Sequence, residues 1–343
     1  IKSAYTFDKT NIYYNYDQNN LAFNNQPLKV FGAQQRFLFP TVYGAQKKLN
    51  TSEFEKEKAR YELEKNKLSL EISKVFYQIV YWQHQEILYN KLDSLYQNFS
   101  KASNRRFELG ETNYLEKITA QAKFRQIALK LSQIKNDKRA QYDLLQSIIQ
   151  SDEKNQITAS KIEPLAFSTE ELSKTIYNNY LQTVTNNYKS QVSMQKQSWL
   201  PDLHLEYFRG SNKGLSQSLN GFQVGISVPI LYSGNVSKAK VAQLDLQSWE
   251  QQVQNENQKV MGFVDQKKNE LLKYQEAINY YNQYGKQLAA EIIKVANMSY
   301  KQGEIDFFQY IQSLENATVI EVEYLDNVLQ FNKTQLDYQY LNF

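Results

Sequence analysis

Two stretches of this chain run for about seventy residues without a proline, and they constrain the fold more than any other feature. The first lies between Pro40 and Gly110 and contains a single glycine, Gly44; the second lies between Pro229 and Gly303. Apolar residues recur along both in steps of three and four, the pattern of helices that pack side by side. At about 1.5 Å per residue, each stretch predicts a helix of roughly 105–110 Å, too long for a compact globule.

Heptad seams follow both stretches. The first carries one seam and, after a phase shift, another: Leu68, Ile72, Val75, Ile79 and Trp82, then Leu88, Leu92, Leu95, Phe99 and Ala102. The second keeps its seven-residue register almost unbroken through Val253, Val260, Val264, Leu271, Tyr274, Ile278, Tyr281, Leu288, Ile292 and Val295. We therefore expect long helices over about 42–109 and 233–302.

The chain turns back after each long helix. We expect return helices over about 112–150 and 305–341, and a shorter helix over about 172–199. The return helices would be about 60 Å long and the shorter helix roughly 40 Å, so that two of them stacked end to end match one long helix. The second return helix has no such partner in this sequence, and we expect a further helix before Ile1.

Short segments between the helices alternate between apolar and polar residues. We expect four strands, over about 3–16, 30–40, 201–210 and 221–230, joined in pairs by polar loops. Each is long enough to cross a bilayer, which takes about 9–11 residues. Pro40, Pro201 and Pro229 mark the corners between strands and helices. Candidates for a lipid-facing surface are Phe31, Phe37, Phe39, Leu203, Leu205, Phe222, Val224, Ile226 and Val228.

Composition excludes several classes of protein. The chain has no Cys, which suits an oxidising compartment such as the periplasm, and only two His, so we expect no dedicated metal site. Forty basic and 36 acidic residues are mixed along the chain, which argues against a nucleic-acid partner. No catalytic constellation or phosphate loop appears, so we expect neither an enzyme nor a cofactor. No apolar run approaches the roughly 20 residues of a membrane-spanning helix.

Four strands cannot close a barrel alone, and a sheet edge cannot face lipid because its amides would stay unpaired. Two copies of the chain would supply eight strands, too narrow for a channel, whereas three would supply twelve and an open lumen. The alternative at this point is a soluble sheet.

One short motif occurs twice. An aromatic residue stands three positions before Gly-Glu in both RRFELGETNYLEKI and NMSYKQGEIDFFQYI, at Gly110-Glu111 and Gly303-Glu304. With GISVPILYSGNVSKAKVAQ and the terminal FNKTQLDYQYL, these segments resemble the TolC family of outer-membrane efflux proteins, the outer-membrane factors of tripartite pumps. The resemblance spans nearly the whole chain. FGAQQRFLFPTVYGAQKK is most similar to members that serve heavy-metal pumps of the resistance-nodulation-division (RND) type, including forms fused to the pump.

The resemblance implies an α+β membrane protein built of two repeats of helix, strand, strand, long helix and helix. These would cover residues 1–150, without the leading helix, and 172–343, joined by an equatorial linker over 151–171. It further implies a homotrimer with a 12-stranded β-barrel in the outer membrane of a Gram-negative bacterium, continued by a long periplasmic α-barrel. The two Gly-Glu turns would face a periplasmic adaptor and an inner-membrane RND pump.

The family also implies a constriction. Its members carry acids one and two turns after the second tip glycine, where this chain departs from the family with Gln309 and Gln312. We expect these residues and Asp306 to line the narrowest ring of a passive duct that conducts metal ions or small toxic compounds. The alternatives are an elongated coiled-coil tether and a periplasmic adaptor. A tether would be soluble without detergent, and an adaptor would have one helical hairpin.

Overall fold

The computed structural model describes residues 6–19, 25–150, 156–159, 161–167, 172–197, 199–214, 217–230 and 233–340. The chain divides into two compact units, which are described separately. The first comprises Ile1–Leu63 and Ile176–Asn257, and the second Glu64–Thr175 and Gln258–Phe343. Among the described residues, no helix has both the length and the apolar character needed to cross a membrane.

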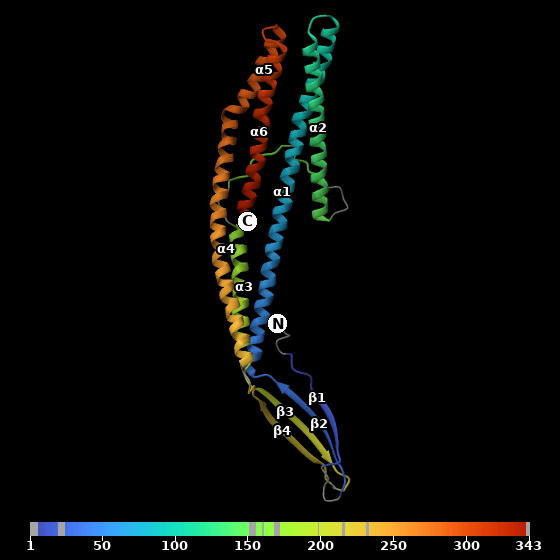
Figure 1. Cartoon of the computed structure of the whole chain (residues 1–343), viewed down its shortest axis with the longest axis vertical. Coiled ribbons are helices and arrows are strands. Elements are labelled where there is room, and N and C mark those ends of the chain that lie inside the picture. The colour runs from blue at the N-terminus through green and yellow to red at the C-terminus, as the bar shows by residue number, and fades with distance from the viewer. Residues whose placement is uncertain are drawn as a thin grey trace. The chain divides into compact units, whose positions relative to one another are not determined.

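The first unit contains a four-stranded antiparallel sheet (Figure 1). Its strands are β1 (Asn11–Asp17), β2 (Leu28–Phe37), β3 (Asp202–Ser211) and β4 (Leu219–Ser227), in the order β1-β2-β3-β4. The central register pairs Phe37 with Leu203 and Leu205 with Val224. Within the described residues, the outer edges of β1 and β4 pair with no further strand.

The first two strands differ from the sequence expectation. β1 begins at Asn11, whereas the expected strand began near residue 3. Residues 1–5 lie outside the described part of the chain. Before it, Thr10 and the carbonyl of Asp8 bond to the side chain of Gln35, so side-chain bonds take the place of ladder bonds there. β2 ends at Phe37, because the backbone N–H of Leu38 donates to the Tyr43 hydroxyl at 3.0 Å and a helix begins at Pro40.

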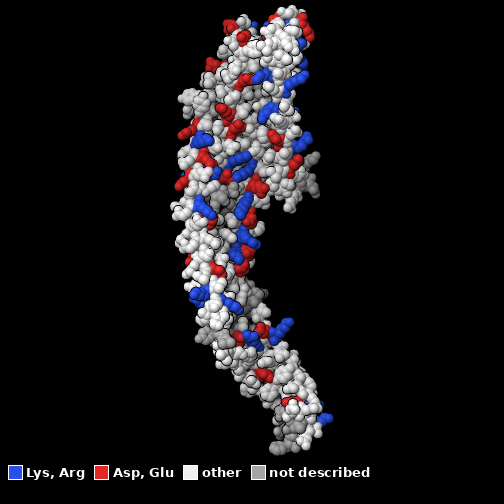
Figure 2. Space-filling view, in the orientation of Figure 1, with Lys and Arg blue, Asp and Glu red and all other residues white. Residues whose placement is uncertain are grey.

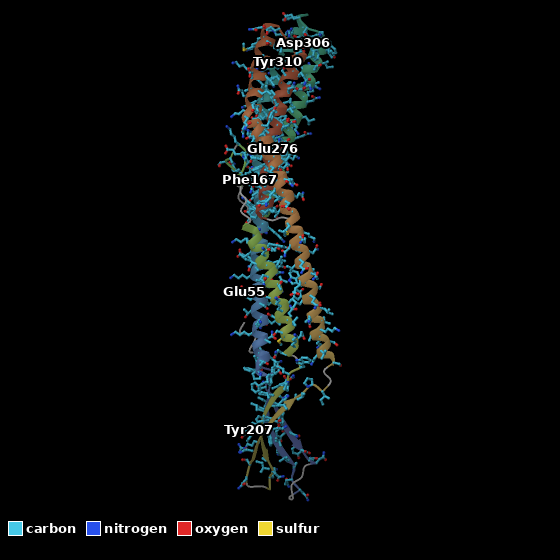
Figure 3. All side chains as sticks on the ribbon, turned by 90° about the vertical axis from the view of Figure 1, so that its left-hand side faces the viewer. Glu55, Phe167, Tyr207, Glu276, Asp306 and Tyr310 are labelled. Carbon is cyan, nitrogen blue, oxygen red and sulfur yellow. The ribbon has the colours of Figure 1, made fainter. Side chains whose placement is uncertain are left out.

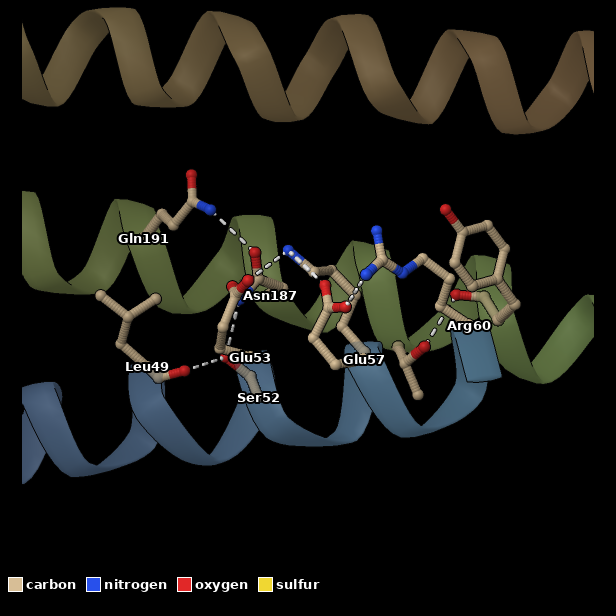
Figure 4. A network of polar contacts seen from close by, with 10 residues as sticks. Leu49, Ser52, Glu53, Glu57, Arg60, Asn187 and Gln191 are labelled. Carbon is tan, nitrogen blue, oxygen red and sulfur yellow. Dashed lines mark hydrogen bonds and ion pairs between the residues drawn. The ribbon is translucent and has the colours of Figure 1, made fainter. Parts of the chain in front are cut away.

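Three helical segments complete the first unit. They are the start of α1 (Pro40–Glu108), α3 (Leu172–Gln197) from Ile176 onward, and the start of α4 (Ser233–Tyr280). Figure 4 shows a polar network between α1 and α3, in which the buried Asn187 donates to Glu53 at 2.8 Å and to Ser52 at 3.2 Å. Trp249 of α4 donates to Thr185 of α3 at 2.9 Å. Paired polar groups of this kind are typical of contacts that fix one helix register.

The second unit is built from two helical hairpins. The first joins the end of α1 to α2 (Tyr114–Ile149); the second joins the end of α4, a π-helix η2 (Tyr281–Gly285) and α5 (Lys286–Gln302) to α6 (Phe307–Tyr340). The turns of both hairpins lie at the same end of this unit (Figure 1). On the face drawn in Figure 2, basic and acidic residues are mixed over the helices, and few lie over the sheet.

The π-helix corrects the expectation of one unbroken helix over 233–302. Up to Tyr281 the buried positions follow the predicted heptads, through Val264, Leu271 and Ile278. A π-turn takes up one extra residue, so the buried face then moves on by one position. Ala289 and Ala296 are buried, whereas the predicted seam residues Leu288 and Val295 are 45% and 52% exposed.

Part of the predicted linker packs onto the helices of the second unit. Asn332 of α6 is fully buried and holds the segment through two backbone bonds, accepting from Leu165 N–H at 2.7 Å and donating to the Glu163 carbonyl at 2.8 Å. His84 of α1 accepts from the N–H of Ile162 at 3.3 Å. The carboxamide of Gln83 and the hydroxyl of Tyr142 bond to the backbone of Ile157 in the same way.

Candidate functional site

The two Gly-Glu turns have the same backbone geometry. Gly110 and Gly303 have φ angles of 75° and 77°, in the left-handed region that glycine adopts without strain. After α1, Glu111 N–H donates to the Arg106 carbonyl at 2.8 Å and Gly110 N–H to that of Phe107 at 3.0 Å. After α5, the corresponding bonds run from Glu304 to Ser299 at 2.9 Å and from Gly303 to Tyr300 at 3.2 Å. Both helices therefore end in a Schellman motif.

Each return helix is capped three residues after its glycine. Asn113 accepts from the N–H of Glu116 at 2.9 Å. Asp306 accepts from the N–H of Gln309 at 2.8 Å, while the Gln309 carboxamide accepts from the N–H of Asp306 at 3.1 Å, which completes a capping box. The recurrence of Gly-Glu in the sequence therefore has a local cause: a left-handed stop and, three residues later, a polar start.

The residues predicted to line the constriction lie on the first turns of α6. Asp306, Gln309 and Gln312 are all exposed in the single chain, and Asp306 is labelled beside the turn in Figure 3. Gln312 donates to Asn316 at 3.0 Å one turn further along. This face of the helix start is polar, whereas Phe307 and Tyr310 on the opposite face are buried. That the polar face lines a constriction stays a prediction.

An aromatic cluster holds the two hairpins together. Phe99 of α1 lies 4.9 Å from Tyr310, 5.9 Å from Tyr300 and 6.3 Å from Phe307, measured between ring centroids. Tyr300 and Tyr310 stack at 4.8 Å. Leu92, Tyr96 and Ala120 of the first hairpin belong to the same buried cluster as Ala296, Ile311 and Leu314 of the second. Burial raises the pKa of Tyr310 to about 12, so its hydroxyl stays protonated and donates to Asn297 at 2.6 Å.

Polar contacts near the turns also join the hairpins. Arg106, which donates to Glu116 of its own hairpin at 3.1 Å, also donates to the Tyr300 hydroxyl of the second hairpin at 3.2 Å, and Lys123 pairs with Glu315 at 2.5 Å. Sequence reasoning did not find these contacts, nor the role of Phe99 beyond its own seam. The only signal was that Arg106 and Tyr300 each stand near the Gly-Glu motif, at positions −4 and −3 from the glycine.

The sheet has one apolar and one polar face. Residues paired across the strands point to the same side, and on one side these are mainly apolar. Their exposure is high, reaching 82% at Phe222. The large exposed apolar members are Ile12, Tyr14, Tyr16, Phe31, Leu205, Tyr207, Phe222, Val224 and Ile226. We call this set the apolar sheet face; Tyr207 is labelled in Figure 3.

The opposite face carries a polar network. Arg36 of β2 bonds to Asp202 of β3, with one N–O distance of 3.0 Å, and His204 bonds to Ser227 of β4 at 2.6 Å. Tyr13 of β1 donates to Glu206. The Tyr13 ring lies over Gly32, where no Cβ would fit, and Phe208 covers Gly221 in the same way. Three polar pairs on this face are therefore formed within the sheet.

The predicted corners and strand ends fall close to where the structure places them, with two corrections. Pro40 is the first residue of α1, Pro201 directly precedes β3, and Pro229 follows β4 by two residues. Phe39 and Val228, both predicted on strands, lie beyond the ends of β2 and β4. Phe39 already accepts the first helical bond, from Val42 N–H at 2.8 Å. Phe37 and Leu203 lie on the sheet but are only partly exposed.

The described part of the chain holds no group of three or more His, Asp or Glu side chains that could bind a metal ion. His204 lies on the polar sheet face and His84 against the linker, each among hydrogen-bond partners already named. Their surroundings offer ordinary hydrogen bonding and no convergent ligand set.

Solved structures of bacterial membrane proteins have a similar fold. A membrane protein from Pseudomonas aeruginosa matches with a TM-score of 0.80 at 12% identity, over 99% of this chain and 82% of that chain. The Campylobacter jejuni CmeC outer membrane channel gives 0.76 at 15%, over 99% and 78%. The outer membrane protein VceC from Vibrio cholerae gives 0.77 at 14%, over 99% and 87%. No protein-family model and no curated protein matches the sequence significantly. The chain therefore shares its fold with solved outer-membrane channels.

Proposed function

We propose that this chain is a TolC-family efflux duct of the outer membrane of a Gram-negative bacterium. The observation that carries the proposal is the sheet, whose apolar face is exposed while its other face is polar and carries three cross-strand polar pairs. In water such a face is unfavourable, at about 25 cal/mol per Å² of apolar surface. In a bilayer the same face is favourable, with the polar network turned toward a water-filled lumen.

The duct is a homotrimer. A single chain cannot pair the outer edges of β1 and β4 with each other in an open sheet. In lipid each unpaired backbone amide on these edges costs several kcal/mol. Pairing of β1 with β4 of a neighbouring copy removes both edges, and three copies give a 12-stranded barrel wide enough for a channel. Residues 1–150 and 172–343 are two structural repeats, and each contributes one helical hairpin to the periplasmic α-barrel.

The capped turns at Gly110 and Gly303 form the periplasmic end of the duct. There they meet a periplasmic adaptor and an inner-membrane pump of the RND type. The protein is not an enzyme, and its transport is passive, through opening and closing of this end. The structural support is that both turns lie at the same end of the second unit, and that the polar contacts which join the hairpins near the turns are partly exposed.

Asp306, Gln309 and Gln312 line the narrowest ring in the closed duct. Two of these three side chains are neutral amides, so the ring carries less charge than one built of acids and binds cations weakly. Replacing both glutamines with Ala should raise the closed-state conductance in planar bilayers. Unchanged conductance would remove these residues from the ring.

Similarity to heavy-metal members extends this proposal to the cargo. Metal ions or small toxic compounds are then substrate, selected by the pump to which the chain is coupled or fused. The support is limited to FGAQQRFLFPTVYGAQKK and FNKTQLDYQYL, because the described residues offer no metal-binding cluster of their own.

A pair of lysine substitutions on β4 tests the duct directly. Val224 lies on the apolar face and its neighbour Gln223 on the polar face, and both are exposed in the single chain. A lysine facing lipid at mid-depth costs about 2–4 kcal/mol, so Val224→Lys should abolish assembly into membranes. Gln223→Lys should assemble normally and shift the ion selectivity of the conductance toward anions. Equal behaviour of the two variants, or a chain that needs no detergent, would favour the tether or the adaptor.

A further inference from the structure

The π-turn between α4 and α5 is the irregular element of the second hairpin. The N–H of Lys286 donates to the carbonyl of Tyr281, five residues back, so this turn holds one residue more than an α-helical turn. Its position is held by Tyr281, whose ring stacks on Tyr324 of α6 at 3.8 Å and whose hydroxyl donates to Glu321 at 2.8 Å. Interruptions of this kind are frequent at functional sites.

The extra residue decides which side chains of α5 face α6. Without it, the seven-residue register that buries Tyr281 would next bury Leu288 and Val295. With it, two alanines one position later, Ala289 and Ala296, are buried in their place, at 1% and 5% exposure. The same helix therefore carries two pairs of seam residues one position apart: the large seam, Leu288 and Val295, and the small seam, Ala289 and Ala296.

The small seam lets the two helices of the hairpin approach closely. Gly285 precedes this seam by one helical turn, and a Cβ added at Gly285 would lie 3.3 Å from the side chain of Ile320 on α6. Leu and Val in place of the two alanines would add several carbons to this contact, and the spacing of packed helices follows the size of the residues between them. The large seam therefore requires α6 to move away from α5.

The register also sets the contacts with the first hairpin. Tyr300 follows the π-turn on α5 and reaches both Phe99 and Arg106 of α1. A change of one residue in the phase of an α-helix turns its side chains by about 100°. Such a turn would carry Tyr300 away from both partners, so the position of the extra residue and the contact between hairpins are coupled.

We propose that the π-turn is a register switch. In the described register the extra residue lies at Tyr281–Gly285 and the alanines face α6. In the second register this turn is α-helical, and the extra residue is accommodated nearer to Gly303. Leu288 and Val295 then face α6, and Tyr300 no longer contacts the first hairpin. The consequence for opening the duct rests on the proposed function, whereas the two registers are a property of the hairpin itself.

Engineered disulfides can report the two registers, because the chain contains no Cys of its own. The antiparallel contacts of Gly285 with Ile320 and of Asn297 with Tyr310 place Ala289 near Ala317, which is fully buried. Ala289→Cys with Ala317→Cys therefore reports the described register. Leu288→Cys with Ala317→Cys reports the second, since a disulfide needs Cα atoms within about 7 Å. Both pairs are oxidised in the full chain in membranes and resolved on non-reducing gels.

Deletion of Gln283 removes the extra residue and makes the alanine seam continuous with the heptads before it. We expect the 289/317 disulfide to form in the parent and in the deletion variant. The 288/317 disulfide should form in the parent, and its rate of formation should fall by about tenfold or more in the deletion variant. A tenfold change corresponds to about 1.4 kcal/mol in the free-energy difference between the two registers. Equal 288/317 rates in the two backgrounds would overturn the switch.

A second variant keeps the test decisive where the deletion prevents folding. Val295→Lys places a charge that is exposed in the described register and buried in the second. It should therefore slow formation of the 288/317 disulfide and leave the rate of the 289/317 disulfide unchanged. Leu272→Lys is the matched control, at 55% exposure on α4 before the π-turn, and should change neither rate. If both registers are found but the protein gives no conductance in bilayers, the proposed duct is rejected and the switch stands. If the protein conducts but only one register is found, the switch is rejected and the duct stands.

Discussion

Removal of the Phe99 side chain should open the contact between the hairpins near their turns more than removal of Arg106 or Lys123. Its ring lies within 6.3 Å of three aromatic rings of the second hairpin, at Tyr300, Phe307 and Tyr310. Phe→Ala in a full core costs about 3–5 kcal/mol, and aromatic pairs contribute about 0.5–1.5 kcal/mol each beyond area. Because Phe99 is only partly buried, we expect Phe99→Ala to weaken the contact by about 2–3 kcal/mol, or about 30- to 150-fold in the equilibrium.

The polar contacts should matter less. Arg106 is 41% exposed, and the Lys123–Glu315 side chains are 31% and 37% exposed, so solvent screens both. Pairs of this exposure contribute about 0–1 kcal/mol, which predicts less than about a fivefold effect for Arg106→Ala or Lys123→Ala. The assay is the rate of thiol labelling at Gln309→Cys in membranes, together with single-channel conductance. Phe54→Ala, at a 57% exposed Phe of the same helix, is the control. An effect of Lys123→Ala equal to that of Phe99→Ala would refute this ranking.

Three further predictions concern stability. Asn187→Ala should lower the free energy of unfolding by about 1–3 kcal/mol, since it removes two hydrogen bonds, to Ser52 and Glu53, of about 0.5–1.5 kcal/mol each, whereas Asn186→Ala, on the exposed side of the same helix, should have little effect in denaturant titrations. Burial and nearby Lys161 lower the pKa of His84, so the unfolded chain binds this proton more readily. Stability should therefore fall as the pH drops below about 6.5, and His84→Gln should reduce that fall in thermal scans. Gly303→Ala should cost about 1–2 kcal/mol through its positive φ alone, because a Cβ added there would meet no atom within 4 Å; an unchanged melting temperature would contradict this.

The helices and three of the four strands follow from local patterns. Period-two alternation locates β2, β3 and β4, while the start of β1 depends on bonds to Gln35, which no local pattern reveals. The turns at Gly110 and Gly303 were identifiable because an aromatic residue and Gly-Glu recur at one spacing, whereas the caps at Asn113 and Asp306 were found only in the structure.

The π-turn could not be read from the seam, because the sequence there supports two registers equally well. Leu288 and Val295 continue the heptads, and only the close fit of Gly285 against Ile320, 35 positions away, favours the alanines. Contacts between the hairpins were missed for a related reason. Arg106 and Tyr300 are separated by 194 positions, and nothing in either segment names its partner.

Joining of the free sheet edges between copies tests the central claim most directly. In an open sheet, β1 and β4 lie three strand spacings apart, about 14 Å, so cysteines on these two edges cannot form a disulfide within one chain. A panel of pairs that combine a cysteine along β1 with one along β4 should, on oxidation in membranes, give a ladder of crosslinked species that ends at three copies. A chain that stays monomeric across the whole panel, with its strands folded, would contradict the duct.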